Sequence, residues 1–389
     1  HSDLDGYYKA PDSSIKQAAG YKRYDTFSLW DTYRAAHPLY TLVCPEITSD
    51  FISSFLAHAD ETGLLPVWSM AGNETNMMIG YHAVPVIVDA FFKNIPMDCE
   101  KAYQACKQTA MSNAWDLLDY KTYGYVPSDG INKGNWSVSK TLEYAFDDYC
   151  IARFAQALKK EDDYLYFLNR STYWKNLFDK SSSFFRPKDK AGNFLKDFSP
   201  KAYTDFFCES NAWQYFWYVP QDIPEFITTV GKEKFTAKLD SMFTYYPSET
   251  DKLPIFSTGM IGQYAHGNEP SHHVAYLFNY IGQPEKTQEM VRQIINSQYS
   301  NKPDGYCGNE DCGQMSAWLV FSSLGMYPVN PANGIYDLTS PWLEKGVIHL
   351  PNGKTFTIST ENQSDKNDYI QNIYLNGEKY DKLTISHQQ

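Results

Sequence analysis

The spacing of apolar residues changes character near residue 325. Before that point apolar residues recur at helical intervals, most clearly over 138–158, where Val138, Leu142 and Phe146 fall one turn apart. After it, segments such as "GVIHL" and "TFTIST" alternate apolar with polar residues and are rich in β-branched side chains. The pattern predicts a mainly α-helical chain, an α-toroid or solenoid, followed by strands of a β-sandwich.

The individual elements follow from the same pattern. The predicted helices are 49–59, 75–93 with a kink at Pro85, 100–118, 138–158, 162–178, 221–230, 232–245, 271–281, 286–297 and 310–324. Ser137 or Ser139 is a candidate N-cap for the fourth. Asn-Gly pairs at 352–353 and 376–377 predict tight turns between strands. Polar, aromatic connectors at 125–134, 184–205 and 246–267 are the loops on which we expect the functional site.

Composition narrows the class of protein. The chain has 389 residues, of which 43% are hydrophobic and 21% charged, a globular balance. A net charge of -12 gives no basic surface for nucleic acid, and no apolar run approaches the roughly 20 residues that span a bilayer. Aromatic residues reach 16%, which suits either sugar binding or a large, well-packed helical core.

Seven cysteines leave the redox state open. None forms a C-x-x-C pair, which argues against a zinc ribbon or a thioredoxin-type motif. Cys99 with Cys106, or Cys307 with Cys312, could close a small disulfide loop. The odd number leaves at least one free thiol or a partner outside the chain.

Two stretches place acids beside tryptophans. In "FSLWDTYRAAHPLY", Asp31 and Arg34 are either an ordinary helical ion pair or, with Trp30, a grip for a sugar ring. In "CESNAWQYFWYVPQD", Glu209 precedes Trp213 and other aromatic residues. A carboxyl group walled by indoles has a raised pKa and suits a general acid, although a helix-start acid above a Trp-rich core explains it as well.

Two further stretches place acids at the start of helices. In "HGNEPSHH", Asn268 and Glu269 either cap a helix or offer oxygen ligands to a hard cation such as Ca²⁺. In "GNEDCGQMSAW", Glu310 and Asp311 either complement the helix dipole or deliver a carboxylate to a reaction. Two carboxylates on separate loops, such as Glu209 and Asp311, fit glycoside hydrolysis.

Taken together and in order, these stretches resemble glycoside hydrolase family 92, the calcium-dependent exo-acting α-mannosidases. The matching segments cover most of residues 1–340 and are "SLWDTYRAAHPLYTL", "GNETNMMIGYHAVPVIVDAFFK", "SVSKTLEYAFDDYCIARFAQAL", "ESNAWQYFWYVPQD", "HGNEPSHHVAYLFNYIGQP" and "GNEDCGQMSAWLVFSSLGMYPVNP".

The resemblance implies an (α/α)6-barrel catalytic domain over residues 1–330, with β-sandwich strands over 331–389 that look truncated and a family N-terminal β-sandwich outside this chain. It implies inverting release of terminal mannose from mannose-containing glycans, with Glu209 as general acid and Asp311 as general base. Asn268 and Glu269 match the calcium motif. The residues matched to the mannose-binding site are Trp30, Asp31, Arg34, Trp213, Gln214, His266, Asn309 and Glu310.

Departures from the family pattern refine these expectations. Members that cleave α-1,2 linkages carry a Glu after the residue matching His266, where this chain has Gly267, so we expect α-1,3 or broader specificity. Asn309 stands where some members carry a second acid. Inversion needs room for a water, so we expect the Glu209 and Asp311 carboxyl groups to lie roughly 6.5–9.5 Å apart.

The resemblance also implies a secreted, periplasmic or cell-surface location. Two other functions fit the same residues. One is a mannose-binding module descended from such an enzyme. The other is a metal-free inverting glycosidase that acts on a different sugar.

Overall fold

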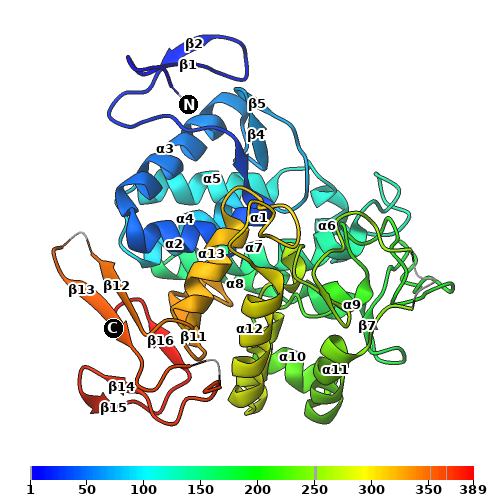
Figure 1. The fold of residues 1–389 in the computed structure, drawn as a ribbon. Helices are drawn as coiled ribbons and strands as arrows, with labels where there is room; N and C mark the ends of the chain where they lie inside the picture. Colours follow the sequence, from blue (N-terminus) through cyan, green and yellow to red (C-terminus); the bar gives the residue numbers. More distant parts are fainter. Residues whose placement is uncertain (1, 249–251, 351, 365) are drawn as a thin grey trace.

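The structure, a computed structural model, describes residues 2–248, 252–350, 352–364 and 366–389, so part of the predicted 246–267 connector lies outside the described residues. The chain begins with a hairpin of β1 (Tyr7–Lys9) and β2 (Ile15–Gln17), seen at the top of Figure 1. Next, β3 (Phe27–Ser28) pairs with β4 (Trp68–Met70), which pairs with β5 (Asn73–Glu74).

Helices make up most of the remaining chain, as the spacing of apolar residues predicts. The first group comprises α1 (Leu29–Thr32), α2 (Ala36–Val43), α3 (Pro45–Thr62), α4 (Ala83–Phe92), α5 (Cys99–Met111), α6 (Leu117–Tyr123), α7 (Ser137–Ala157) and α8 (Glu161–Arg170). The second group comprises α9 (Ala212–Tyr215), α10 (Ile223–Val230), α11 (Lys232–Thr244), α12 (Pro284–Gln298) and α13 (Gln314–Ser323). The 3₁₀ segments are η1 (Tyr173–Leu177), η2 (Glu269–Ser271), η3 (Val274–Ile281) and η4 (Pro331–Asn333). Two short hairpins, β6 (Phe178–Asp179) with β7 (Phe184–Phe185) and β8 (Met260–Ile261) with β9 (Tyr264–Ala265), lie between helices.

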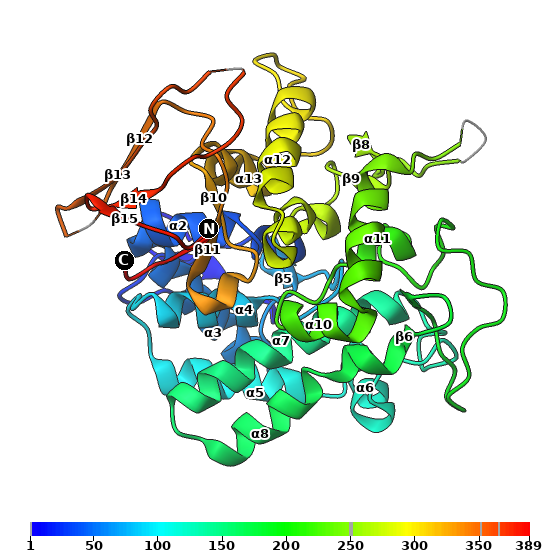
Figure 2. The same ribbon diagram turned by 90° about the horizontal axis from the view of Figure 1, so that it is seen from below.

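Helix α7 is the centre of the helical region. It contacts α4, α5 and α8, and Figure 2 shows it between α4 and the α5–α8 layer. Almost every residue of α7 is buried, including the acids Glu143, Asp147 and Asp148. Buried charges need partners, and Asp148 has one in Arg170 of α8 at 2.7 Å. Glu143 and Asp147 share a partner in His82, whose two ring nitrogens lie 2.8 Å from one carboxylate each.

Most of the aromatic excess belongs to the core. Trp174, Trp217 and Trp318 are each no more than 1% exposed, and their rings meet neighbouring rings at steep angles. Such edge-to-face contacts stabilise a core beyond the area that the rings bury. The high aromatic content is therefore mainly a packing feature of this fold.

The C-terminal strands form small antiparallel sheets, at the lower left of Figure 1. One sheet pairs β10 (Met326–Tyr327) with β11 (Ile335–Leu338), and β11 with β16 (Thr384–Ser386). Two hairpins join β12 (Lys345–His349) to β13 (Thr355–Ser359) and β14 (Tyr374–Leu375) to β15 (Glu378–Lys379). The predicted turn at Asn376–Gly377 is confirmed, with φ of 52° and 87°. Since β10 precedes residue 330 and pairs beyond it, the domain division at 330 stays a prediction.

Several predicted helix ends are wrong, for a common reason. Helix α4 begins at Ala83, not near residue 75, because Asn76, Met78 and Gly80 have φ of 51°, 68° and 80°. A left-handed backbone cannot continue a right-handed helix. The same effect at Trp115 and Asp116 (φ 52° and 68°) follows the end of α5 at Met111.

Two further local predictions, the N-cap of α7 and the helix at 271–281, differ from the structure. Neither Ser137 nor Ser139 caps α7, because Trp136 occupies the N-cap position and no side chain accepts a hydrogen bond there. The segment 271–281 is largely 3₁₀ rather than α-helix. Within the described residues, no helix is both long and apolar enough to cross a membrane.

Neither predicted disulfide forms, since all seven cysteines are free thiols. Cys99 and Cys106 both lie on α5. Seven residues of helix separate them by roughly 10 Å along the axis, beyond the reach of a disulfide. Cys307 is partly buried, whereas Cys312 is exposed.

Candidate active site

Three acids that are far apart in the sequence meet in space. Asp31 comes from α1, Glu269 from η2 and Asp311 from the loop before α13, and one carboxylate oxygen from each lies within 4.8 Å of the others. We call these three residues the acidic cluster. Glu209 lies close enough for its charge to raise the pKa of Asp31. Asn268 links Glu209 to the cluster, because its side-chain amide donates to the Glu209 carbonyl at 2.9 Å and its oxygen accepts from the Glu269 N–H at 3.1 Å.

Both candidate catalytic acids have a left-handed backbone. Glu209 has φ of 49°, and Asp311, Cys312 and Gly313 follow one another at 56°, 57° and 104°. For a residue with a side chain this conformation costs about 1–2 kcal/mol. Strained backbone of this kind gathers at functional sites, where the surrounding structure holds it in place.

The two acids before α13, Glu310 and Asp311, make different contacts. Glu310 caps the helix: it accepts from the Gly313 N–H at 2.7 Å and from the Ser316 N–H and hydroxyl at 3.2 and 2.5 Å. Asp311 is hydrogen bonded to Glu269 instead. The capping explanation therefore holds for Glu310, and Asp311 is the acid that joins the cluster. Asn309 is exposed.

Burial and mutual repulsion disfavour ionisation of these carboxyl groups. Burial, together with the charges of Asp311 and Glu209, raises the pKa of Asp31 to about 7, although the Ser28 hydroxyl and Arg34 act in the opposite direction. Burial also raises the pKa of Glu269 well above its ordinary value, and burial with the charge of Asp311 raises that of Glu209. A group of acids in this state holds protons or attracts a cation.

The acidic cluster fits a divalent cation. Glu269 is 1% exposed, yet its Oε1 has no hydrogen-bond partner. Buried polar atoms are normally paired, and a bound cation would satisfy an unpaired carboxylate oxygen in such a cluster. Carboxylate and carbonyl oxygens are the donors that Ca²⁺ prefers. Among the predicted calcium residues, Glu269 offers a free oxygen, whereas the side chain of Asn268 is already hydrogen bonded at both ends.

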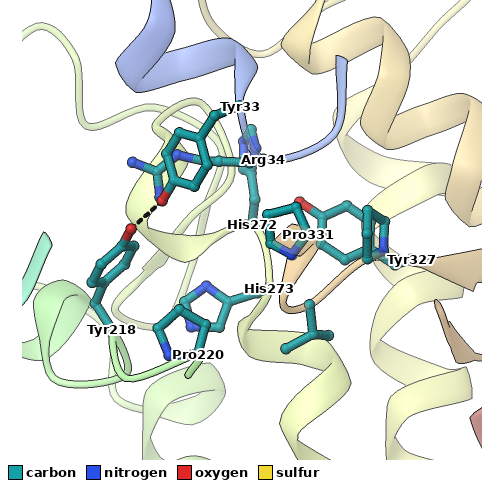
Figure 3. Close-up of a pocket in the computed structure, with 10 residues that line it drawn as sticks. Tyr33, Arg34, Tyr218, Pro220, His272, His273, Tyr327 and Pro331 are labelled. Carbon is teal, nitrogen blue, oxygen red and sulfur yellow. Dashed lines mark hydrogen bonds between the residues drawn. The ribbon is translucent and has the colours of Figure 1, made fainter. Parts of the chain in front are cut away.

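Arg34 is the cation beside the cluster. Its Nε donates to the Trp30 carbonyl at 3.0 Å, and its guanidinium stacks on Trp30 and Tyr33 at 4.9 and 4.8 Å. Figure 3 shows Arg34 beside Tyr33 and Tyr218, whose hydroxyl groups form a hydrogen bond. A cavity of about 20 Å³, room for about one water, lies next to Arg34 and is lined by none of the four acids.

The other predicted sugar-binding residues make contacts within the fold. Trp213 packs on Phe184 and Tyr245, with ring centroids 5.2 and 5.7 Å apart. Gln214 completes a capping box with Asn211 at the start of α9. Their roles in sugar binding stay predictions.

His266 is buried in a similar way. Its two ring nitrogens lie 2.7 Å from the hydroxyl groups of Tyr264 and Tyr299. Its ring also packs edge-on against Trp318. Both nitrogens thus have partners already, and a direct role in sugar binding stays a prediction.

The sequence reasoning missed one residue behind the site. Glu143 in the middle of α7 is fully buried and accepts from the Trp30 indole N–H at 2.9 Å and the Tyr215 hydroxyl at 2.7 Å. Its partners lie far from it in the sequence, so no spacing pattern could have singled it out.

Acids that come from separate segments of a helical domain and meet next to a candidate cation site fit the requirements of glycoside hydrolysis. Similarity to known proteins leads to the same class, the glycoside hydrolases. The model of the glycosyl hydrolase family 92 catalytic domain matches residues 1–389, and the chain belongs to this family.

Solved structures of the family are similar throughout the chain. A family GH92 α-mannosidase from Bacteroides thetaiotaomicron, in complex with mannoimidazole, has a TM-score of 0.96 and 45% identity, covering 100% of this chain and 52% of that one. A family GH92 inverting mannosidase from the same organism has a TM-score of 0.87 and 34% identity, covering 98% and 54%. An uncharacterized secreted glycosidase from Arthroderma benhamiae is 30% identical over 370 residues, 84% of this chain and 45% of that protein. The chain thus spans about half the length of these relatives.

Proposed function

We propose that this chain is the catalytic part of an inverting, calcium-dependent exo-α-mannosidase that releases terminal mannose from glycans. The observation that carries the proposal is the convergence of Asp31, Glu269 and Asp311 beside Glu209. Two of the similar structures are mannosidases of this family, one of them an inverting mannosidase. The (α/α)6 arrangement of the helices and a secreted or periplasmic location belong to the same proposal.

The proposed reaction is a single displacement at the anomeric carbon. Glu209 gives its proton to the glycosidic oxygen as the bond from carbon to the leaving group breaks. Asp311 takes a proton from a water, whose oxygen forms the new bond on the opposite face of the ring. The raised pKa of Glu209 supports its role, because burial and the charge of Asp311 let this acid keep a transferable proton to higher pH than an ordinary glutamate.

Glu269 and Asp31 are the residues that would hold Ca²⁺, with Asp311 next to them. The side-chain oxygen of Asn268, which accepts one hydrogen bond and has a second lone pair, stays a proposed ligand. When bound, the ion would supply positive charge near the sugar hydroxyl groups and favour ionised acids in the cluster. Arg34 supplies the second positive charge, which lowers the pKa of Asp31. Trp30, Asp31 and Arg34 are proposed to line the mannose-binding site.

We further propose that the enzyme is not a strict α-1,2-mannosidase. A Cβ at Gly267 would lie 1.9 Å from the Thr258 hydroxyl oxygen, a distance that atoms do not tolerate. A glutamate at position 267 would therefore require the Thr258 side chain to move. The lack of that glutamate is what supports α-1,3 or broader specificity.

The test is release of mannose from α-1,2-, α-1,3- and α-1,6-linked mannobiose, before and after EDTA and again with Ca²⁺ restored. We expect activity that EDTA abolishes and Ca²⁺ rescues, greatest on a linkage other than α-1,2. NMR of the first product should show β-mannose, the inverted anomer. Mannose binding without hydrolysis would indicate a binding module, and EDTA-resistant cleavage of another glycoside a metal-free glycosidase.

A further inference from the structure

Glu143 connects two short helices that flank the candidate site. Through Oε1 it accepts from Trp30 of α1 at 2.9 Å and from Tyr215 of α9 at 2.7 Å. Asp31 follows Trp30 directly in α1, and α9 begins three residues after Glu209. Helices of four residues are not stable on their own, so contacts with the surrounding structure must set their positions.

The other oxygen of Glu143 is held by His82. The His82 Nε2 lies 2.8 Å from Glu143 Oε2, and its Nδ1 lies 2.8 Å from Asp147 Oδ1, one helical turn further along α7. Tyr33 stacks on the imidazole with ring centroids 4.2 Å apart. Burial lowers the pKa of His82, but the two carboxylates outweigh it and raise that pKa to about 9.

These contacts hold the Oε2 side of the Glu143 carboxylate in place. Both nitrogens of His82 face carboxylates, which is the arrangement of a doubly protonated imidazole. A charged ring between two carboxylates also compensates their burial, since Glu143 and Asp147 are both fully buried. Arg34 adds a further positive charge, with Nη2 3.8 Å from Glu143 Oε1.

We propose that Glu143, held by His82, is a positioning residue that fixes α1 relative to α9 and thereby aligns Asp31 with Glu209. The inference rests on the proposed function for its catalytic consequence. Its structural consequence is independent: without this contact the two acids should separate or turn away from each other. Displacement of about 1 Å can cost on the order of a hundredfold in rate.

Two variants, each of which changes a single polar group, distinguish loss of the positioning contact from a general loss of stability. Tyr215→Phe removes only the hydroxyl that joins α9 to Glu143. Tyr120→Phe is the matched control, because Tyr120 is as deeply buried and its hydroxyl lies 3.2 Å from Asp148, an acid on the same helix as Glu143 that shares no hydrogen bond with Glu143 or His82. Both variants should lower the unfolding temperature.

The experiment measures kcat and KM on the best mannobiose and solves crystal structures of both variants. We expect Tyr215→Phe to lower kcat about tenfold or more with a smaller change in KM, and to move the Asp31 and Glu209 carboxyl groups by more than about 0.5 Å. Tyr120→Phe should keep kcat within about twofold and leave that separation unchanged.

Equal loss of kcat in both variants at matched unfolding temperatures, or an unmoved pair of acids in Tyr215→Phe, would overturn the positioning role. If the unsubstituted protein cleaves no mannoside, the proposed function fails instead. In that case the separation of the two acids in the crystal structures still decides whether Glu143 positions them.

Discussion

Replacement of Glu209 by Gln tests the proposed general acid most directly. The Gln side chain has nearly the same shape and is neutral, so it adds no charge beside Asp311. The only chemical loss is the transferable proton. General acid catalysis contributes about 10²–10⁴ in rate, so we expect kcat on mannobiose to fall roughly a thousandfold, or about 4 kcal/mol in activation free energy.

The size of that loss should depend on the leaving group. An aryl mannoside with a strongly electron-withdrawing ring leaves without protonation, so Glu209→Gln should cleave it within about tenfold of the rate of the unsubstituted enzyme. The assay compares kcat for mannobiose and for such an aryl mannoside in both proteins. Asp311→Asn is the control, because loss of the proposed base should slow both substrates alike. An equal loss on both substrates in Glu209→Gln would refute the assignment of Glu209 as the acid.

Three further predictions follow from buried charges. Calcium at a hundred times its Kd should raise the free energy of unfolding by about 2.7 kcal/mol, seen as a higher unfolding temperature in a calorimetric scan, and Glu269→Gln should remove this effect. Burial raises the pKa of Asp337 to about 7, so the folded state binds its proton more tightly than the unfolded state, and stability is lost as pH rises from about 4 to 7. Asp337→Asn should therefore stabilise the protein by up to about 4 kcal/mol at pH 8 and not at pH 4, as measured by urea unfolding. Lys93→Met should cost about 3–5 kcal/mol because it leaves Asp89, now 2.7 Å from the Lys93 ammonium, unpaired in the core, and adding Asp89→Leu should recover most of the loss.

The fold was predictable where apolar periodicity was strong. Helix α7 was predicted at 138–158 and runs from Ser137 to Ala157, because its apolar residues are numerous and no left-handed residue interrupts it. The prediction of 75–93 failed over its first half for the opposite reason. Asn76 is of a residue type that tolerates a positive φ, but nothing in the type of Met78 reveals one, because its φ is set by the loop around it.

The site was predictable in its residue types but not in its geometry. Motifs singled out Asp31, Glu269 and Asp311, and the structure brings them together. The sequence could not tell Glu310 from Asp311, since neighbouring acids before a helix look alike. The backbone turn through Asp311 and Cys312 separates their roles, leaving one acid to cap the helix and the other to join the cluster. Glu143 was missed because its partners are distant in the sequence.

The contact between Gly267 and Thr258 bears on how specificity can evolve in this lineage. Gly308, three residues before Asp311, is pressed against the same threonine, since a Cβ there would lie 2.8 Å from the Thr258 hydroxyl oxygen and 2.9 Å from the Gly267 Cα. A side chain at position 267 is thus acceptable only if the Thr258 side chain turns away or residue 258 becomes smaller. Positions 258, 267 and 308 are therefore coupled, and a descendant that gains a glutamate before Asn268 should also show a changed conformation or residue type at 258.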